Sequence, residues 1–244
     1  MTEDVTRSAV LALDAATEAC SSAVVVGDVE LASRFEPLKR GHAERLMPMI
    51  ETVMAEAGLD YSALGAIATT IGPGSFTGVR VGLATARGIS LAAALPLVGV
   101  TTLEALAVAV PPEERQGHRI LAALDALRGQ IYAQWFDAAG LPLSLPMAAA
   151  AAQVVAASDA AAAWVVVGSG ANAILDALGP ARVRVVRSSA ADWPEAATIG
   201  RLVSLRASLA GGIGRLAATS VQPLYLRDAG ARPLEGAGMP MGMP

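Results

Sequence analysis

The sequence predicts an α/β protein built from two similar halves. An apolar run that ends in aspartate, Val10 to Asp14, has a counterpart in the run Leu121 to Asp125. A short turn and a second apolar run follow each copy, which is the pattern of paired strands. Between the copies, apolar strands alternate with helical segments, as they do in α/β folds. Chance repetition is the alternative, because apolar runs that end in aspartate are common.

The repeat sets the expected domain organisation. We place the first half at residues 1–105 and the second at 106–227. At 244 residues and 54% hydrophobic content, the chain can bury a core in each half. Residues 228–244 are rich in glycine, proline and methionine, a composition that predicts a disordered tail.

The elements of the first half follow from local patterns. Leu46, Ile50, Val53 and Ala57 recur at helical spacing, so one side of that helix should face the core. Pro48 should kink this helix or mark its true start. Thr101 and Glu104 have the form of a capping box at the start of another helix. The expected order is strands 9–14, 22–26 and 30–35, helix 42–57, strand 66–71, loop 72–75, helix 77–94 and strand 97–100.

The second half is expected to repeat this alternation. Apolar runs predict its strands, and a short glycine-containing loop separates one strand from the next helix. The expected order after the repeated pair of strands is strand 164–167, loop 168–170, a helix to residue 178, strand 183–186 and helix 195–209.

Composition excludes several classes of protein. Cys20 is the single cysteine and the chain has two histidines, so a disulfide framework is excluded and a zinc site is disfavoured. Residues 1–8 lack the features of a secretory signal, and apolar runs are interrupted before they could span a bilayer. A cytoplasmic location fits best. The net charge of −4 disfavours strong solitary binding to nucleic acid, so another subunit should grip any RNA substrate.

A glycine-rich segment, residues 72–88, carries the most information. It passes from a strand into a helix, where backbone N–H groups can hold an anion. The Gly-Lys-Ser/Thr sequence of a P-loop and the dinucleotide glycine spacing are both missing, so phosphate binding stays a minority hypothesis. Gly78, Gly82 and Ala86 are spaced by four and predict a groove of small residues that another backbone could approach.

The neighbouring helix offers a second apolar feature. Met47 and Met54 lie seven residues apart and off the expected core side, and methionine suits adaptable contact surfaces. The two helices could therefore form one side of a helical interface between subunits. The alternative is that the second domain of the same chain covers both faces.

The glycine-rich segment, Ile71 to Gly88, resembles the signature of the TsaB family, also called YeaZ. The resemblance extends in order along residues 9–227. Further landmarks are Leu13-Asp14 with Thr17 to Ser21, His42 to Leu46 with Pro48, Val98 to Leu106, Asp125 to Tyr132, and Pro223 to Arg227.

This resemblance implies a duplicated actin-like fold, related to ribonuclease H and the ASKHA group, with mixed sheets flanked by helices. It also implies a non-catalytic subunit in tRNA threonylcarbamoyladenosine synthesis, which pairs with a catalytic TsaD subunit and helps recruit the ATPase TsaE. Family members can also form homodimers through the same surface. The expected interface residues are His42, Arg45, Leu46, Met47, Met49, Met54, Gly74, Thr77, Gly78, Val81, Gly82 and Thr85.

We expect no catalytic, nucleotide-binding or metal-binding residues and no cofactor. The HxxxH motif of the catalytic subunit is missing, since His42 and His118 stand apart in the sequence. Alanines follow Asp14, where actin-like kinases need glycine to admit phosphates. Cys20 has no histidine nearby, and Ser75 lacks the context of a nucleophile elbow. The alternatives are a stand-alone ATP-dependent actin-like enzyme and a metallopeptidase-like protein.

Overall fold

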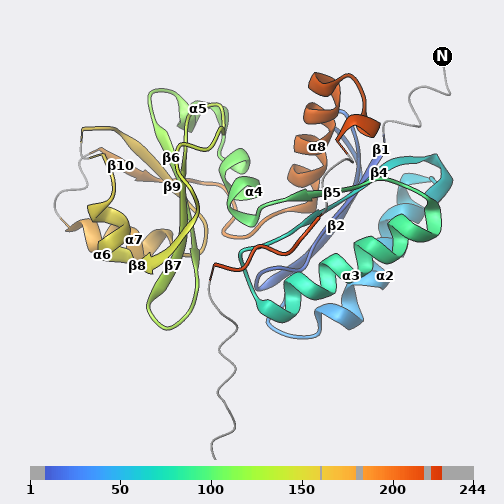
Figure 1. The fold of residues 1–244 in the computed structure, drawn as a ribbon, viewed down its shortest axis with the longest axis horizontal. Helices are drawn as coiled ribbons and strands as arrows, with labels where there is room; N and C mark the ends of the chain where they lie inside the picture. Colours follow the sequence, from blue (N-terminus) through green and yellow to red (C-terminus); the bar gives the residue numbers. More distant parts are fainter. Residues whose placement is uncertain (1–8, 160, 180–183, 217–220, 227–244) are drawn as a thin grey trace, which may run out of the picture.

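The computed structural model describes residues 9–159, 161–179, 184–216 and 221–226. The predicted tail at 228–244 and part of the strand expected at 183–186 lie outside these residues. Within them, Figure 1 shows two β-sheets side by side, each flanked by helices.

The first sheet is mixed and has the order β3-β2-β1-β4-β5. β1 pairs antiparallel with β2 and parallel with β4, so it lies at the centre of the sheet. All six residues of β1 are buried, because helices cover both faces of the sheet. The strands are β1 (Ala9–Asp14), β2 (Ala19–Val26), β3 (Val29–Pro37), β4 (Leu64–Thr70) and β5 (Leu97–Val100).

The second sheet repeats this arrangement, with the order β10-β9-β6-β7-β8. Its central strand β6 pairs antiparallel with β7 and parallel with β9, as β1 does with β2 and β4. The duplicated α/β architecture expected from the repeated Asp-terminated strands is therefore confirmed. The strands are β6 (Arg119–Asp125), β7 (Gln130–Phe136), β8 (Met147–Ala150), β9 (Trp164–Val167) and β10 (Val185–Arg187).

The helices divide between the faces of the two sheets. α2 and α3 lie together on one face of the first sheet, and α8 covers the opposite face (Figure 1). In the second half, α4 packs on one face and α6 and α7 on the other. Their bounds are α2 (His42–Ala57), α3 (Phe76–Ala93), α4 (Thr102–Ala109), α5 (Pro112–Arg115), α6 (Ala151–Ala156), α7 (Ala171–Leu178) and α8 (Ala196–Ala210), with 3-10 turns η1 (Tyr61–Ala63) and η3 (Ile213–Arg215).

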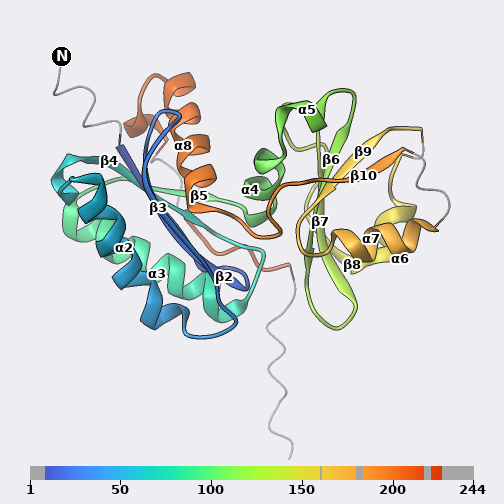
Figure 2. The ribbon, with the colours of Figure 1, turned by 180° about the vertical axis from the view of Figure 1, so that it is seen from behind.

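Two helices link the halves. Leu103 and Leu106 of α4 pack on the second sheet, and the expected division at residue 105 falls inside this helix. α8 follows the second sheet in the chain, yet its Ile199 and Val203 pack on the first sheet. Figure 2 shows the segment before α8 crossing from one half to the other. The division into two domains at residue 105 remains a prediction.

Most local predictions hold to within a few residues. α2 has the bounds expected from its apolar spacing, so Pro48 lies inside the helix and does not mark its start. Thr101 caps α4, because its hydroxyl oxygen accepts a hydrogen bond from the Glu104 N–H at 3.1 Å. β2 and β3 are longer than expected, because their pairing extends away from the Gly27-Asp28 turn as far as Ala19 and Pro37.

Candidate functional site

The outer helices α2 and α3 present one side to the sheet and the other to solvent. On the inner side, Leu46, Ile50 and Val53 of α2 are fully buried, and Val79 and Leu83 of α3 are nearly so. Ser75 caps the N-terminus of α3 by accepting a hydrogen bond from the Gly78 N–H at 3.3 Å. The spacing of the large apolar residues therefore decides which side of each helix faces the core.

The groove of small residues predicted along Gly78, Gly82 and Ala86 is filled by this chain itself. A Cβ atom added to Gly78 would lie 2.0 Å from the Ala15 carbonyl oxygen, and one added to Gly82 would lie 3.5 Å from Thr69 Oγ1. These glycines let α3 approach the turn after β1, so the predicted groove along them is occupied within this chain, and a partner contact at Gly78 or Gly82 stays a prediction. The backbone that approaches them is that of Ala15.

Three interface residues predicted on α2 are also core residues. Leu46, Met49 and Met54 have relative exposures of 0%, 6% and 5%, and all three belong to the core beneath the helix. Met54 was expected off the core side. The 16-residue helix carries a broad apolar side, wide enough to include Met49 and Met54 beside the main stripe.

An open groove of about 1040 Å³ runs between α2 and α3 on their outer side. Ala84, Gly88 and Ala92 of α3 form its floor at a spacing of four, and Met47 of α2 is 38% exposed beside them. No atom lies within 4 Å of a Cβ built on Gly88, so this glycine faces open space. The complete lining is Met47, Glu51, Tyr61, Ser62, Ala84, Thr85, Gly88, Ile89, Ala92 and Ala93.

The remaining predicted interface residues lie in different places. Met47 and Thr85 line the outer groove, whereas His42 and Gly74 line a separate cleft. Arg45 is exposed and forms an ion pair with Glu36 of β3 at 2.6 Å. Thr77 is exposed at the start of α3, and Val81 is half-buried against the core of the first half. Whether they contact a partner stays a prediction.

Ala84, Gly88 and Ala92 were not among the predicted interface residues. α3 carries two stripes of small residues at the same spacing, and the predicted stripe is the one that faces the sheet. The signal that separates them is the position of Val79 and Leu83, which lie beside Gly78 and Gly82 and mark the core side. Spacing alone does not distinguish the two stripes.

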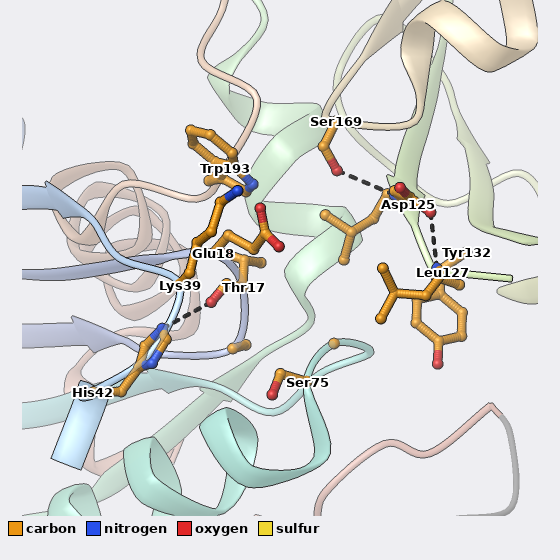
Figure 3. A pocket seen from close by; sticks show the side chains of 14 residues that line it. Thr17, Glu18, Lys39, His42, Ser75, Asp125, Leu127, Tyr132, Ser169 and Trp193 are labelled. Atoms are coloured by element: carbon orange, nitrogen blue, oxygen red, sulfur yellow. Dashed lines mark hydrogen bonds between the residues drawn. The ribbon is translucent and has the colours of Figure 1, made fainter. Parts of the chain in front are cut away.

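A second candidate site is a cleft of about 310 Å³ between the halves, shown in Figure 3. The first half contributes Thr17, Lys39 and Ser75, and the second contributes Asp125 and Trp193. Lys39 is the only lysine in the sequence, and it forms no ion pair with any residue that the structure describes. The full lining also includes Ala16, Glu18, His42, Gly74, Leu124, Ala126, Leu127, Tyr132 and Ser169.

Hydrogen bonds fix both walls of this cleft. A ring nitrogen of His42, Nε2, lies 2.9 Å from the Thr17 carbonyl oxygen. On the other wall, the Asp125 N–H donates to Ser169 Oγ at 3.1 Å, and the Leu127 N–H donates to Asp125 Oδ1 at 2.8 Å (Figure 3). His42 thus connects α2 to the turn after β1.

The turn after β1 is closed by contacts within the chain. Ala15 and Ala16 are fully buried, and the Ala16 carbonyl oxygen accepts a hydrogen bond from the Ser75 N–H at 2.7 Å. The Ala16 N–H donates to Asp14 Oδ1 at 3.2 Å. A phosphate cradle needs such N–H groups free, so this turn is poorly suited to bind one.

Asp14 is the most perturbed carboxyl of the described residues. Burial raises its pKa to about 6, although hydrogen bonds from the Thr70 hydroxyl and the turn backbone oppose the shift. Asp14 Oδ2 has no hydrogen-bond partner among the described residues. A buried carboxylate with one unpaired oxygen destabilises the fold when it is charged.

Other chemical groups offer little reactivity. Burial raises the pKa of the Cys20 thiol to about 12, so the thiolate form is scarce at neutral pH. His118 lies in the turn before β6, with Nδ1 2.9 Å from the Gln116 carbonyl oxygen. Among the described residues, no group of three His, Cys, Asp or Glu side chains could hold a metal ion. Of the helices in that same part of the chain, none is long and apolar enough to cross a membrane.

Comparisons with known proteins identify relatives along most of the chain. Residues 36–233 match the family model described as "TsaD: tRNA N6-adenosine threonylcarbamoyltransferase". A protein of Escherichia coli K12, "tRNA threonylcarbamoyladenosine biosynthesis protein TsaB", is 41% identical over 123 residues. That alignment covers 50% of this chain and 52% of the relative, so the chain spans about half the length of such curated relatives.

Solved structures match more of the chain. "YeaZ from Pseudomonas aeruginosa" has a TM-score of 0.75 and 30% identity, and the match covers 90% of this chain and all of that one. Component A of the (R)-2-hydroxyglutaryl-CoA dehydratase of Acidaminococcus fermentans has a TM-score of 0.50 and 10% identity, covering 82% of this chain and 99% of that one. The latter likeness shows the fold alone, which is the duplicated actin-like fold.

Proposed function

Because this chain belongs to the TsaB (YeaZ) family, we propose that it is a non-catalytic scaffold or activator subunit in tRNA threonylcarbamoyladenosine biosynthesis. Its partner is a TsaD-like subunit that carries out the threonylcarbamoyl transfer next to the anticodon. The pair in turn helps to recruit a TsaE-like ATPase. tRNA is contacted through the complex, in the cytoplasm, and the acidic balance of this chain accords with that role.

The observation that carries this proposal is the apolar groove between α2 and α3. Its floor of Ala84, Gly88 and Ala92 lets another helix approach closely, and Met47 can adapt to that helix. Leu91 extends the apolar surface, with 84% of its side chain exposed. A face of this kind on two adjacent helices suits a bundle of helices shared between subunits.

The turn after β1 supports a non-catalytic role. Where an actin-like kinase would bring phosphates to this backbone, Ala15 and Ala16 are sealed against α3. Any activity of the complex is therefore assigned to the partner, and this chain positions it.

A binding experiment with matched variants tests the proposal. Gly88→Leu places a bulky side chain in the open groove and should weaken association with the TsaD-like subunit at least tenfold by ultracentrifugation, with a melting temperature that is not lowered. The control Leu209→Ala alters a side chain that is 80% exposed on α8, away from the groove, and should leave association unchanged. Full association of Gly88→Leu would overturn the assignment of the groove.

A second copy of this chain is the alternative occupant of the same groove. Sedimentation of the chain alone, and then with increasing concentrations of the TsaD-like subunit, distinguishes the homodimer from the heterodimer. If the partner displaces the homodimer, both associations use the groove. Normal tRNA modification in cells that lack this chain would overturn the functional proposal itself.

A stand-alone ATP-dependent enzyme is the second candidate, and the cleft of Figure 3 favours it. Lys39, which has no ion pair within the described part of the chain, and the indole ring of Trp193 line that cleft, and these groups can bind phosphate and base. Calorimetry with Mg-ATP on the isolated chain decides between the two candidates, since tight binding with turnover would favour the enzyme. For a metallopeptidase-like protein, metal analysis of the purified chain would have to find a stoichiometric ion.

A further inference from the structure

A short segment near the end of the described chain lies along α3. Residues 221–226, here called the strap, follow the N-terminal part of α3, in red in Figure 1. The Leu224 N–H donates to the Ile71 carbonyl oxygen at 2.7 Å, just before the glycine-rich loop. A Cβ atom on Gly72 would lie 2.7 Å from the Leu224 carbonyl oxygen, so a glycine admits the strap there.

The strap contacts both charged residues of α3. Arg80 Nε donates to the Tyr225 hydroxyl oxygen at 3.0 Å, and the guanidinium carbon lies 3.6 Å from the centre of the Phe76 ring. The Phe76 and Tyr225 rings are 5.3 Å apart. Further along the helix, Arg87 Nη2 donates to the Val221 carbonyl oxygen at 2.6 Å. Two flexible side chains are thereby held in defined positions.

Each of these arginines keeps unused donors. Among the residues that the structure describes, no hydrogen bond or ion pair involves the two Nη groups of Arg80 or Nη1 of Arg87. Both side chains are exposed. Seven residues of helix separate them by about 10 Å along the axis, which is two turns. Ala84, which lines the groove, is one helical turn from each arginine, and neither arginine itself lines the groove.

The opposite edge of the groove carries the opposite charge. Glu51 of α2 lines the groove and is exposed, and within the described part of the chain it forms no ion pair. Burial, and to a smaller extent the Glu51 carboxylate, raise the pKa of the neighbouring Tyr61. Positive charge therefore lies beside Ala84 on α3, and negative charge lines the groove on α2. Such an arrangement favours one orientation of the occupant.

We infer that the strap presents Arg80 and Arg87 as a recognition edge for carboxylates of the partner subunit, spaced two helical turns apart. The inference rests on the proposed function, because it takes the groove as the docking site. A guanidinium held against aromatic rings loses little freedom on binding, and its planar fork matches a carboxylate. The apolar floor beside the edge favours a protein helix over an RNA backbone as the occupant.

The test measures association of the full chain with the TsaD-like subunit between 50 and 500 mM salt, values chosen to span strong to weak screening of charges. Arg80→Gln with Arg87→Gln should raise the Kd roughly tenfold at low salt and flatten its salt dependence. Tyr225→Ala, which removes the support of Arg80 but no charge, should raise the Kd by a factor of about three. Arg184→Gln, an exposed arginine of the second half, is the matched control and should change nothing.

The outcomes separate this inference from the function on which it rests. If Gly88→Leu abolishes association and the arginine variants bind as the wild type does, the groove stands and the recognition edge is overturned. If Gly88→Leu has no effect on association, the groove is not the docking site, and the recognition edge is overturned with it. Equal weakening at every salt concentration, together with a lowered melting temperature, would show that the arginines only hold the strap. Arginine-dependent binding of tRNA by the isolated chain, with partner affinity unchanged, would overturn the inference in favour of RNA.

Discussion

The α-carbon of Gly78 faces the carbonyl oxygen of Ala15 so closely that a Cβ atom would lie 2.0 Å from that oxygen. Ten residues further along the same helix, a Cβ on Gly88 would meet no atom within 4 Å. Gly78 and Gly88 thus have different roles in α3. The first allows the helix to rest on the turn after β1, and the second opens the surface on the other side.

Alanine substitution should separate these roles. Gly78→Ala should destabilise the fold by roughly 2 kcal/mol or more, because the turn or the helix must move to admit the methyl group. Gly88→Ala should stabilise it by about 0.5–1 kcal/mol, because alanine favours the helix. Urea unfolding of both variants measures the difference. Equal effects would contradict the arrangement of α3.

Asp14 should make stability depend on pH. Its pKa is about 6 in the fold and 3.8 without burial, so the folded state binds the proton more tightly. Its contribution is then fully present below about pH 4 and is lost as the pH rises through 6. Relative to Asp14→Asn, the wild type should lose about 3 kcal/mol between pH 4 and 7.5. Unfolding curves at both pH values check this, and parallel pH profiles would refute it.

The ion pair between Glu104 and Arg206 joins α4 to α8. Burial lowers the pKa of Arg206, and Glu104→Gln would leave its charge partly buried without a counter-charge. We expect a loss of roughly 1–3 kcal/mol in the free energy of unfolding. Glu104→Gln combined with Arg206→Met should lose less than Glu104→Gln alone, because no buried charge remains. A double-mutant cycle by chemical denaturation measures the coupling, and strictly additive effects would show that the pair contributes nothing.

The turn between β6 and β7 places two side-chain-bearing residues in the left-handed region. Leu127 and Arg128 have φ angles of 61° and 56°. Asparagine and glycine adopt this conformation more readily, so Leu127→Asn with Arg128→Gly should stabilise the fold by about 1 kcal/mol. Thermal unfolding checks the sign. A lower melting temperature would mean that contacts of the Leu127 side chain in the cleft outweigh the backbone strain.

The sequence alone predicted most of the elements in their order, because apolar spacing reflects burial directly, but it missed α5, β8 and α6. The repetition of an apolar strand that ends in aspartate, at Asp14 and again at Asp125, indicated the duplicated architecture. The glycine-rich segment and the ordered landmarks indicated the family. These predictions succeeded because each depends on local pattern or on a long shared motif.

The side of a helix that meets a partner was harder to predict. Gly82 and Gly88 are flanked by similar residues in the sequence. What distinguishes them is the structure, where a Cβ on Gly82 would lie near Ala15 and one on Gly88 would meet no atom within 4 Å. The strap was also beyond reach, since Tyr225 and Arg80 are 145 residues apart in the chain. Long-range contacts of that kind leave no periodicity in the sequence.

The return of α8 to the first sheet has a consequence during synthesis. Val10 and Val25 lie on the side of the sheet that Ile199 and Val203 of α8 cover. These α8 residues leave the ribosome long after β5 is complete. At about 5–20 residues per second, the interval is on the order of ten seconds. During this interval, one face of the nascent sheet is apolar and exposed to solvent. That face can bind chaperones or associate with other nascent chains. The first sheet therefore gains its second covering layer only when α8, the last α-helix of the described residues, has been synthesised.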